Sequence, residues 1–186
     1  MRLQRDAARR RAPEACRSIK KMKTPSAILL ILLFTVGCST QSFHAPSKSM
    51  EPTIPEGSSV TIDYNAYRSS DPARFDIVAF NPPEPANAVF IFRVLGLPGE
   101  TISIQTNGIF INGHSLPLPV GLQYEPNDTE PSVKKLGLAE YYLLGDNTTV
   151  ANDSRHYGPI KRDRILGKVE EIEPAPPAGR GEAPRP

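Results

Sequence analysis

The chain has 186 residues with 22 basic and 20 acidic side chains, a formal net charge of +2. Residues 1–23 hold nine basic and two acidic residues and carry +7, so the remaining chain carries −5. An acidic remainder argues against a basic phosphate-binding surface, and with it against nucleic acid as the expected partner. The length allows one domain with a real core, and 20 prolines without tryptophan favour a turn-rich β protein.

The first predicted element is a short apolar segment at residues 25–38. Its uncharged run AILLILLFTV follows a basic leader, residues 1–24. As a helix, fourteen residues extend about 21 Å, whereas a bilayer core needs about 30 Å. The segment is therefore typical of a signal peptide, with its basic side facing the cytoplasm. Met22 is an alternative start to Met1, in which case residues 1–21 would be a mis-annotated extension.

The apolar segment ends in Thr35-Val36-Gly37-Cys38. This ending resembles the lipobox of bacterial lipoproteins, which implies cleavage before Cys38 and lipidation of its thiol. The alternative is a retained membrane anchor in which Cys38 has no role. Both interpretations place residues 39–186 outside the cytoplasm and tethered to membrane lipid.

Beyond this segment, the sequence predicts a short tether at 39–45, one domain at 46–172 and a disordered tail at 173–186. The tail contains the proline-rich sequence PAPPAGRGEAPRP, which cannot bury enough apolar surface to fold. No internal repeat or long helical periodicity occurs in the central block.

Short β-branched and alternating stretches fill the predicted domain. The expected strands are Ser58–Tyr64, Asp76–Phe80, Ala88–Leu95, Thr101–Gln105, Ile109–Ile111, Glu140–Leu144 and Ile165–Ile172. Asn107-Gly108 predicts a hairpin turn of type I′, and Asn112-Gly113 predicts a second tight turn. We therefore expect an all-β fold, an antiparallel sandwich or partly open barrel.

Three segments together resemble bacterial signal peptidase I, the membrane-bound serine peptidase that removes signal peptides from exported proteins. They are PSKSMEPT at 46–53, RVLGLPGE at 93–100, and GDN at 145–147 followed by NDSRHYG at 152–158. Their order and separation also match, and the resemblance covers about residues 43–172. It implies the β fold of that family, with an N-terminal membrane segment.

The resemblance assigns roles to residues of these motifs. Ser49 would be the nucleophile, and its own N–H with the Ser47 hydroxyl would face the oxyanion. Asp146 and Arg155 are expected to be structural ties below the site. The full set of expected supporting residues is Met50, Pro52, Thr53, Arg93, Gly145, Asp146, Asn147, Ala151, Asp153, Ser154 and Arg155.

The chain departs from the family at its general base. The family has a lysine immediately before the arginine of the second motif, where this chain has Phe92. No lysine lies between Ser49 and Lys134, so a shift in register cannot supply one. Ala151 replaces the serine that often supports that lysine in the family. The family's Arg-Asp-Asn after GDN is also replaced, here by Thr148-Thr149-Val150.

Other residues are weaker candidates for the base. His156 follows the third motif and is the best histidine. His114 follows the Asn112-Gly113 turn and is expected to be a solvated loop residue. Lys48 neighbours Ser49, but adjacent residues of an extended chain point to opposite faces.

Two hypotheses remain from the sequence. The first is a signal peptidase I-like serine endopeptidase that cleaves exported preproteins at the outer face of the membrane. The second is a catalytically impaired pseudopeptidase that binds extended peptides as an extracytoplasmic or chaperone-like module. Neither needs a cofactor, and the sequence contains no metal-ligand spacing, phosphate loop or dinucleotide fingerprint.

Overall fold

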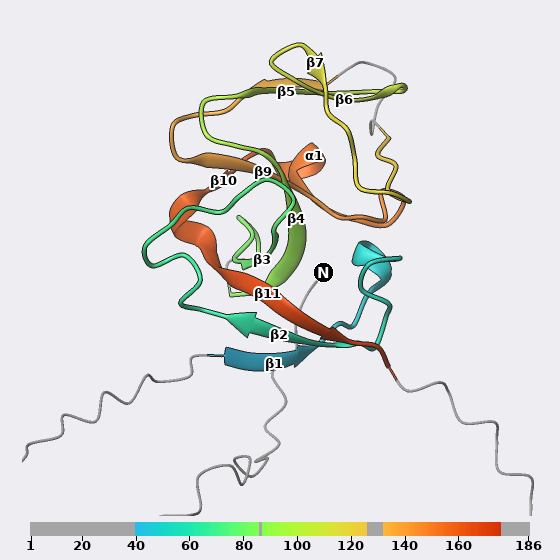
Figure 1. Ribbon diagram of the computed structural model, residues 1–186, viewed down its shortest axis with the longest axis vertical. Coiled ribbons are helices and arrows are strands. Elements are labelled where there is room, and N and C mark those ends of the chain that lie inside the picture. The colour runs from blue at the N-terminus through green and yellow to red at the C-terminus, as the bar shows by residue number, and fades with distance from the viewer. Residues whose placement is uncertain (1–39, 86, 126–131, 176–186) are drawn as a thin grey trace, which may run out of the picture.

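The computed structural model describes residues 40–85, 87–125 and 132–175, which form two antiparallel β-sheets (Figure 1). The predicted basic leader (1–24), the signal or anchor segment (25–38) and most of the predicted tail lie outside the described residues. The all-β expectation is confirmed, because every strand pairing in both sheets is antiparallel.

The larger sheet has seven strands. In spatial order they are β1 (Thr40–His44), β2 (Ser59–Asp63), β11 (Ile165–Glu173), β3 (Ile77–Phe80), β4 (Phe90–Gly96), β9 (Glu140–Leu144) and β10 (Ile160–Lys161). The final long strand, β11, lies between β2 and β3 and so joins the first strands of the chain to its middle. This arrangement brings β4 and β9 side by side, and the candidate site lies where β9 ends.

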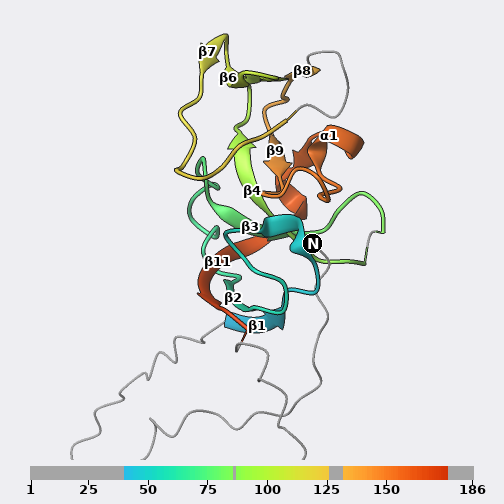
Figure 2. The same ribbon diagram turned by 90° about the vertical axis from the view of Figure 1, so that its right-hand side faces the viewer.

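The smaller sheet has four strands and lies at the opposite end of the molecule from β1 and β2 (Figures 1 and 2). Its order is β7 (His114–Ser115), β6 (Gly108–Ile111), β5 (Thr101–Gln105) and β8 (Ser132–Lys135). The turn between β4 and β5 joins the two sheets. There Glu100 accepts a hydrogen bond from the Leu97 N–H at 2.8 Å, while its other oxygen binds Arg74.

Helical structure is limited to three short elements in the described residues. They are the 3₁₀ turns η1 (Lys48–Met50) and η2 (Arg162–Arg164) and the single-turn helix α1 (Ser154–Tyr157). Over the described ranges, no helix is long and apolar enough to span a bilayer.

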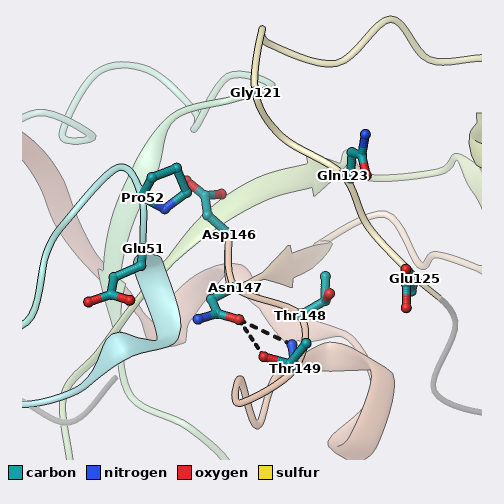
Figure 3. Close-up of a pocket in the computed structure, with 9 residues that line it drawn as sticks. All are labelled: Glu51, Pro52, Gly121, Gln123, Glu125, Asp146, Asn147, Thr148 and Thr149. Atoms are coloured by element: carbon teal, nitrogen blue, oxygen red, sulfur yellow. Dashed lines mark hydrogen bonds between the residues drawn. The ribbon is translucent and has the colours of Figure 1, made fainter.

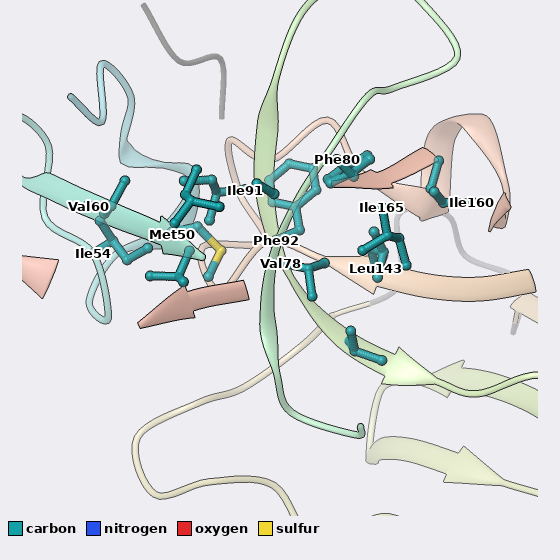
Figure 4. Packing of buried hydrophobic residues seen from close by; sticks show 14 of the residues in the cluster. Met50, Ile54, Val60, Val78, Phe80, Ile91, Phe92, Leu143, Ile160 and Ile165 are labelled. Carbon is teal, nitrogen blue, oxygen red and sulfur yellow. The ribbon is translucent and has the colours of Figure 1, made fainter. Parts of the chain in front are cut away.

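The apolar residues form two clusters, one for each sheet. The larger cluster includes Phe80, Ile91 and Phe92 from β3 and β4, and Met50 of η1 packs into it (Figure 4). The smaller cluster combines Ile102 and Ile104 of β5 with residues such as Leu95 of β4. Strand β4 is thus buried along nearly its whole length because it contributes to both clusters.

The structure contains all seven predicted strands, with boundaries shifted by at most two residues. It also contains β1, β7, β8 and β10, which the sequence patterns did not predict. The expectation of a tether at 39–45 is corrected by the structure. Thr40–His44 form strand β1 and pair with β2 over five residues. Likewise, β11 extends to Glu173, the first residue of the predicted tail.

The two predicted turns are both present but differ in type. Asn112 and Gly113 have φ values of 50° and 83°, as a type I′ turn requires. In the first hairpin, Gln105 pairs with Gly108, so the loop residues are Thr106 and Asn107. Neither has a positive φ, so the type I′ prediction for that hairpin is wrong. Gly108 instead opens β6 at φ 133°, a conformation that favours glycine.

Candidate active site

Ser49 lies in the middle of η1, where the chain turns between β1 and β2. The residue is 7% exposed, and the Ser47 hydroxyl donates to Ser49 Oγ at 3.3 Å. Ser47 is the extended residue that precedes the turn, while the fully buried Met50 fixes the turn to the core. The two serines of the first motif are therefore adjacent in space, and the turn holds the Ser49 hydroxyl at the edge of the core.

A second loop, which follows β9, packs directly against this turn. The Asn147 N–H donates to the Ser49 carbonyl oxygen at 3.0 Å. A Cβ on Gly145 would lie 2.5 Å from Ala151 Cβ, 2.7 Å from Ser49 O and 3.1 Å from Phe92 Cε1. The space next to the Gly145 Cα is therefore surrounded by atoms of Ser49, Phe92 and Ala151. Only glycine, which has no Cβ, fits at position 145 without displacing them. The positions that the resemblance gives to the base and its supporter lie beside Ser49.

Phe92 fills that position with an aromatic ring. Its side chain is fully buried and packs against Phe80 (Figure 4), with ring centroids 5.6 Å apart. It also packs against Phe90, with ring centroids 6.0 Å apart. The ring has no lone pair that could take a proton from Ser49. Ala151 is also buried and contributes only a methyl group. The side chains at both of these positions are therefore apolar.

The weaker candidates for the base lie elsewhere on the fold. His156 is exposed on α1, and His114 is exposed on β7 in the smaller sheet. The Lys48 side chain is 59% exposed, with its ammonium 4.0 Å from the Glu56 carboxylate. None of the three belongs to the buried group that surrounds Gly145.

Below the site, a buried ion pair connects the second and third motifs. Arg93 Nε donates to Asp146 Oδ1 at 2.9 Å, and Arg93 Nη2 donates to Asp146 Oδ2 at 2.6 Å. Thr53 and Tyr124 also donate to this carboxylate. Burial disfavours the charge of Arg93, but the hydrogen bonds and charge of Asp146 outweigh it and raise the Arg93 pKa.

Tyr124 was not predicted from the sequence as a site residue. Its hydroxyl lies 2.6 Å from Asp146 Oδ1, and burial together with the Asp146 charge raises the Tyr124 pKa. Tyr124 comes from the loop after β7, which carries none of the three motifs. Only the fold brings it to Asp146, so no local pattern could have identified it.

A second ion pair fixes the loop after β9. Asp153 caps α1 by accepting from the Arg155 N–H at 3.0 Å, and it also accepts from the Gly145 N–H at 3.1 Å. The Arg155 guanidinium binds Asp153 and donates to the carbonyl oxygens of Glu125 and Thr148, each at 3.0 Å. The buried Ser154 hydroxyl accepts from the Leu143 N–H. These contacts fix the backbone that supports Ser49.

Comparison with known proteins identifies signal peptidases as similar sequences. Residues 18–172 match the family described as "Signal peptidase, peptidase S26". "Probable signal peptidase I-2" of Synechocystis is 30% identical over 151 residues, which cover 74% of this chain and 66% of that relative. "Signal peptidase I V" of Bacillus subtilis is 33% identical over 138 residues, covering 67% of this chain and 80% of the relative. The solved structure of a signal peptidase I from Enterococcus faecalis is 28% identical, with a TM-score of 0.46, and covers 54% of this chain and 98% of its own.

Proposed function

The chain belongs to the signal peptidase family, peptidase S26, and we propose that it is a signal peptidase I-like serine endopeptidase that cleaves signal peptides from exported preproteins. The observation that carries this proposal is the position of Ser49. Its hydroxyl is held at the core edge, beside the Ser47 hydroxyl and above two buried ion pairs. A rigid support of this kind is what a nucleophile needs in order to attack in one fixed geometry.

In the proposed reaction, Ser49 Oγ loses its proton and attacks the carbonyl carbon of the scissile peptide bond. The carbon–nitrogen bond then breaks, and the amine leaves with a proton as the new N-terminus of the mature protein. Water hydrolyses the remaining acyl-enzyme ester, which releases the signal peptide and restores the Ser49 hydroxyl. The Ser47 hydroxyl and the Ser49 N–H stabilise the oxygen that becomes negative. A single donor of this kind typically lowers the barrier by about 3–4 kcal/mol. The two buried ion pairs, Arg93 with Asp146 and Arg155 with Asp153, have a positioning role. Their charged atoms bind each other and the backbone.

Proton transfer is the step in which this chain differs from its family. Phe92 cannot accept the Ser49 proton, so the base is not at that position. General base catalysis typically contributes about 10²–10⁴ to the rate. We therefore expect turnover slower by about that factor than in a relative with lysine at position 92, with oxyanion stabilisation and substrate positioning supporting the remaining rate.

The proposed location is the outer face of the membrane. The basic leader and the apolar segment support this orientation, with the domain exported. We also propose that Cys38 is lipidated. Mass measurement of the mature N-terminus distinguishes a lipidated Cys38 from a retained anchor.

The test is cleavage of a preprotein by the full chain in detergent micelles. The proposal predicts one new N-terminus, located by mass spectrometry at the end of the signal peptide. A protein with Ser49→Ala should produce none. If the purified chain binds the preprotein but does not cleave it, the peptidase proposal is wrong and the peptide-binding module is the correct alternative.

A further inference from the structure

A pocket of about 430 Å³ opens next to the Ser49 turn (Figure 3). One side is formed by Glu51 and Pro52, which directly follow η1. The Asn147 end of the pocket is connected to Ser49, because the Asn147 N–H donates to the Ser49 carbonyl oxygen. The pocket therefore borders the turn that carries Ser49. The nine lining residues are Glu51, Pro52, Gly121, Gln123, Glu125, Asp146, Asn147, Thr148 and Thr149.

The lining is negatively charged. Seven of the nine residues have polar side chains, and none of the nine is lysine, arginine or histidine. Asp146 is already neutralised by Arg93. Glu51 and Glu125 therefore supply the net charge, and Figure 3 shows them on opposite sides of the pocket.

Two of the segments that line the pocket, the loop at 121–125 and the loop at 146–149, are held in place by buried residues. The loop that carries Gly121, Gln123 and Glu125 is attached at Tyr124, whose hydroxyl donates to Asp146. Arg155 donates to the carbonyl oxygens of Glu125 and Thr148 and so connects the two loops. The cavity is therefore pre-formed, which reduces the entropy lost when a ligand is ordered in it.

The chemistry of the lining identifies the class of ligand. Two carboxylates with nearby amide and hydroxyl oxygens suit a positively charged group that donates hydrogen bonds. In the described part of the chain, no three acidic, histidine or cysteine side chains are grouped closely enough to hold a metal ion. A single cationic side chain fits this site better than a metal.

We propose that this pocket is a specificity subsite that binds a lysine or arginine side chain of the substrate, close to the cleaved bond. An extended peptide advances about 3.3 Å per residue, so the side chain belongs within about three residues of that bond. The inference rests on the proposed function, because it takes the peptide cleaved at Ser49 as the ligand. Thr148 and Thr149 line the pocket at positions where this chain departs from the family.

The test measures peptide binding separately from turnover. The full chain with Ser49→Ala is titrated in detergent with fluorescent ten-residue peptides that span a preprotein cleavage site. Lysine is compared with norleucine, its uncharged analogue, at each of three positions on either side of the bond. The same peptides are then titrated against chains that also carry Glu51→Gln with Glu125→Gln, or Glu170→Gln as an exposed control outside the pocket.

At one position we expect lysine to bind about three- to tenfold more tightly than norleucine, the range for one or two partly exposed ion pairs. This preference should fall below about twofold in Glu51→Gln/Glu125→Gln and in 0.5 M salt, since salt screens exposed charges. Glu170→Gln should retain it.

Equal binding of both peptides, or a preference that survives in the double variant, overturns the inference. If the chain with Ser49 intact still cleaves a preprotein, the proposed function is unaffected by that result. If no peptide binds and no preprotein is cleaved, the proposed function fails, and the inference fails with it.

Discussion

Arg93 and Asp146 form a buried, two-pronged ion pair, with nitrogen–oxygen distances of 2.9 and 2.6 Å. Each of the two residues directly follows a residue that packs near Ser49. Arg93 follows Phe92, and Asp146 follows Gly145. The pair therefore fixes strand β4 to the loop after β9 at the place where both meet the Ser49 turn.

Replacing Asp146 with asparagine should strongly destabilise the protein. The Arg93 guanidinium would keep its charge in a buried site without a full partner, which typically costs about 3–5 kcal/mol. Urea unfolding measures the change in free energy. Asp71→Asn is the matched control, because Asp71 pairs with Arg162 but is 77% exposed, and such pairs contribute about 0–1 kcal/mol. Equal losses in the two variants would contradict this account.

Gly145→Ala should disturb the site itself. The new methyl group would lie 2.5 Å from Ala151 Cβ and 2.7 Å from Ser49 O, so the Ser49 turn or the loop must move. Overpacking of this kind typically costs about 1–3 kcal/mol. We expect that loss in urea unfolding together with a fall in preprotein cleavage of at least about tenfold.

Gly137→Ala is the control for Gly145→Ala. Its nearest neighbours are atoms of the Glu140 side chain, which can move away. It should leave cleavage within about twofold of the original chain. Wild-type cleavage by Gly145→Ala would mean that the packing around Gly145 does not position Ser49.

Phe92→Lys alone should increase cleavage by less than about tenfold. The ammonium would enter a space bounded by Phe80 and Phe90, and Ala151 has no acceptor to orient it. Adding Ala151→Ser should raise the rate further, because a hydroxyl then lies beside the new lysine. Initial rates of preprotein cleavage compare the two variants. A large gain from Phe92→Lys alone would show that Ala151 is not a second obstacle.

Asp76 should contribute to the loss of stability in acid. Burial raises its pKa, but hydrogen bonds from Lys168, Ala73 and Tyr67 outweigh burial and lower the pKa below 3.8. The stabilisation is therefore present above about pH 4 and is lost as the pH falls through the folded-state pKa. Below about pH 4, urea unfolding of Asp76→Asn should show a flatter decline than the original chain. Parallel curves would exclude this role for Asp76.

Much of the fold was predictable because its central strands carry local patterns. Alternating β-branched residues identified strands such as β2 and β5, and β5 and β9 were predicted to the residue. The edge strands β1, β7 and β10 are short or polar, so their formation depends on a partner strand rather than on their own sequence. Asn107-Gly108 predicted the hairpin, but the register of β5 with β6 determined which residues form the loop.

The candidate site was predictable only where residues belong to a motif. Ser47 contacts Ser49, and Arg93 pairs with Asp146, and all four residues belong to the motifs. Tyr124 reaches the same network from a loop without a motif, and the charged pocket is assembled from three separate segments. Contacts of this kind depend on tertiary packing, which no single stretch of sequence encodes.

Initial rates of preprotein cleavage by three forms of the full chain test most directly whether Ser49 is the nucleophile of a signal peptidase. The original chain should release a mature protein, Ser49→Ala should release none, and Ser47→Ala should be about 10²–10³ slower through loss of one oxyanion donor. If Ser49→Ala cleaves at the original rate, Ser49 is not the nucleophile and the account is wrong.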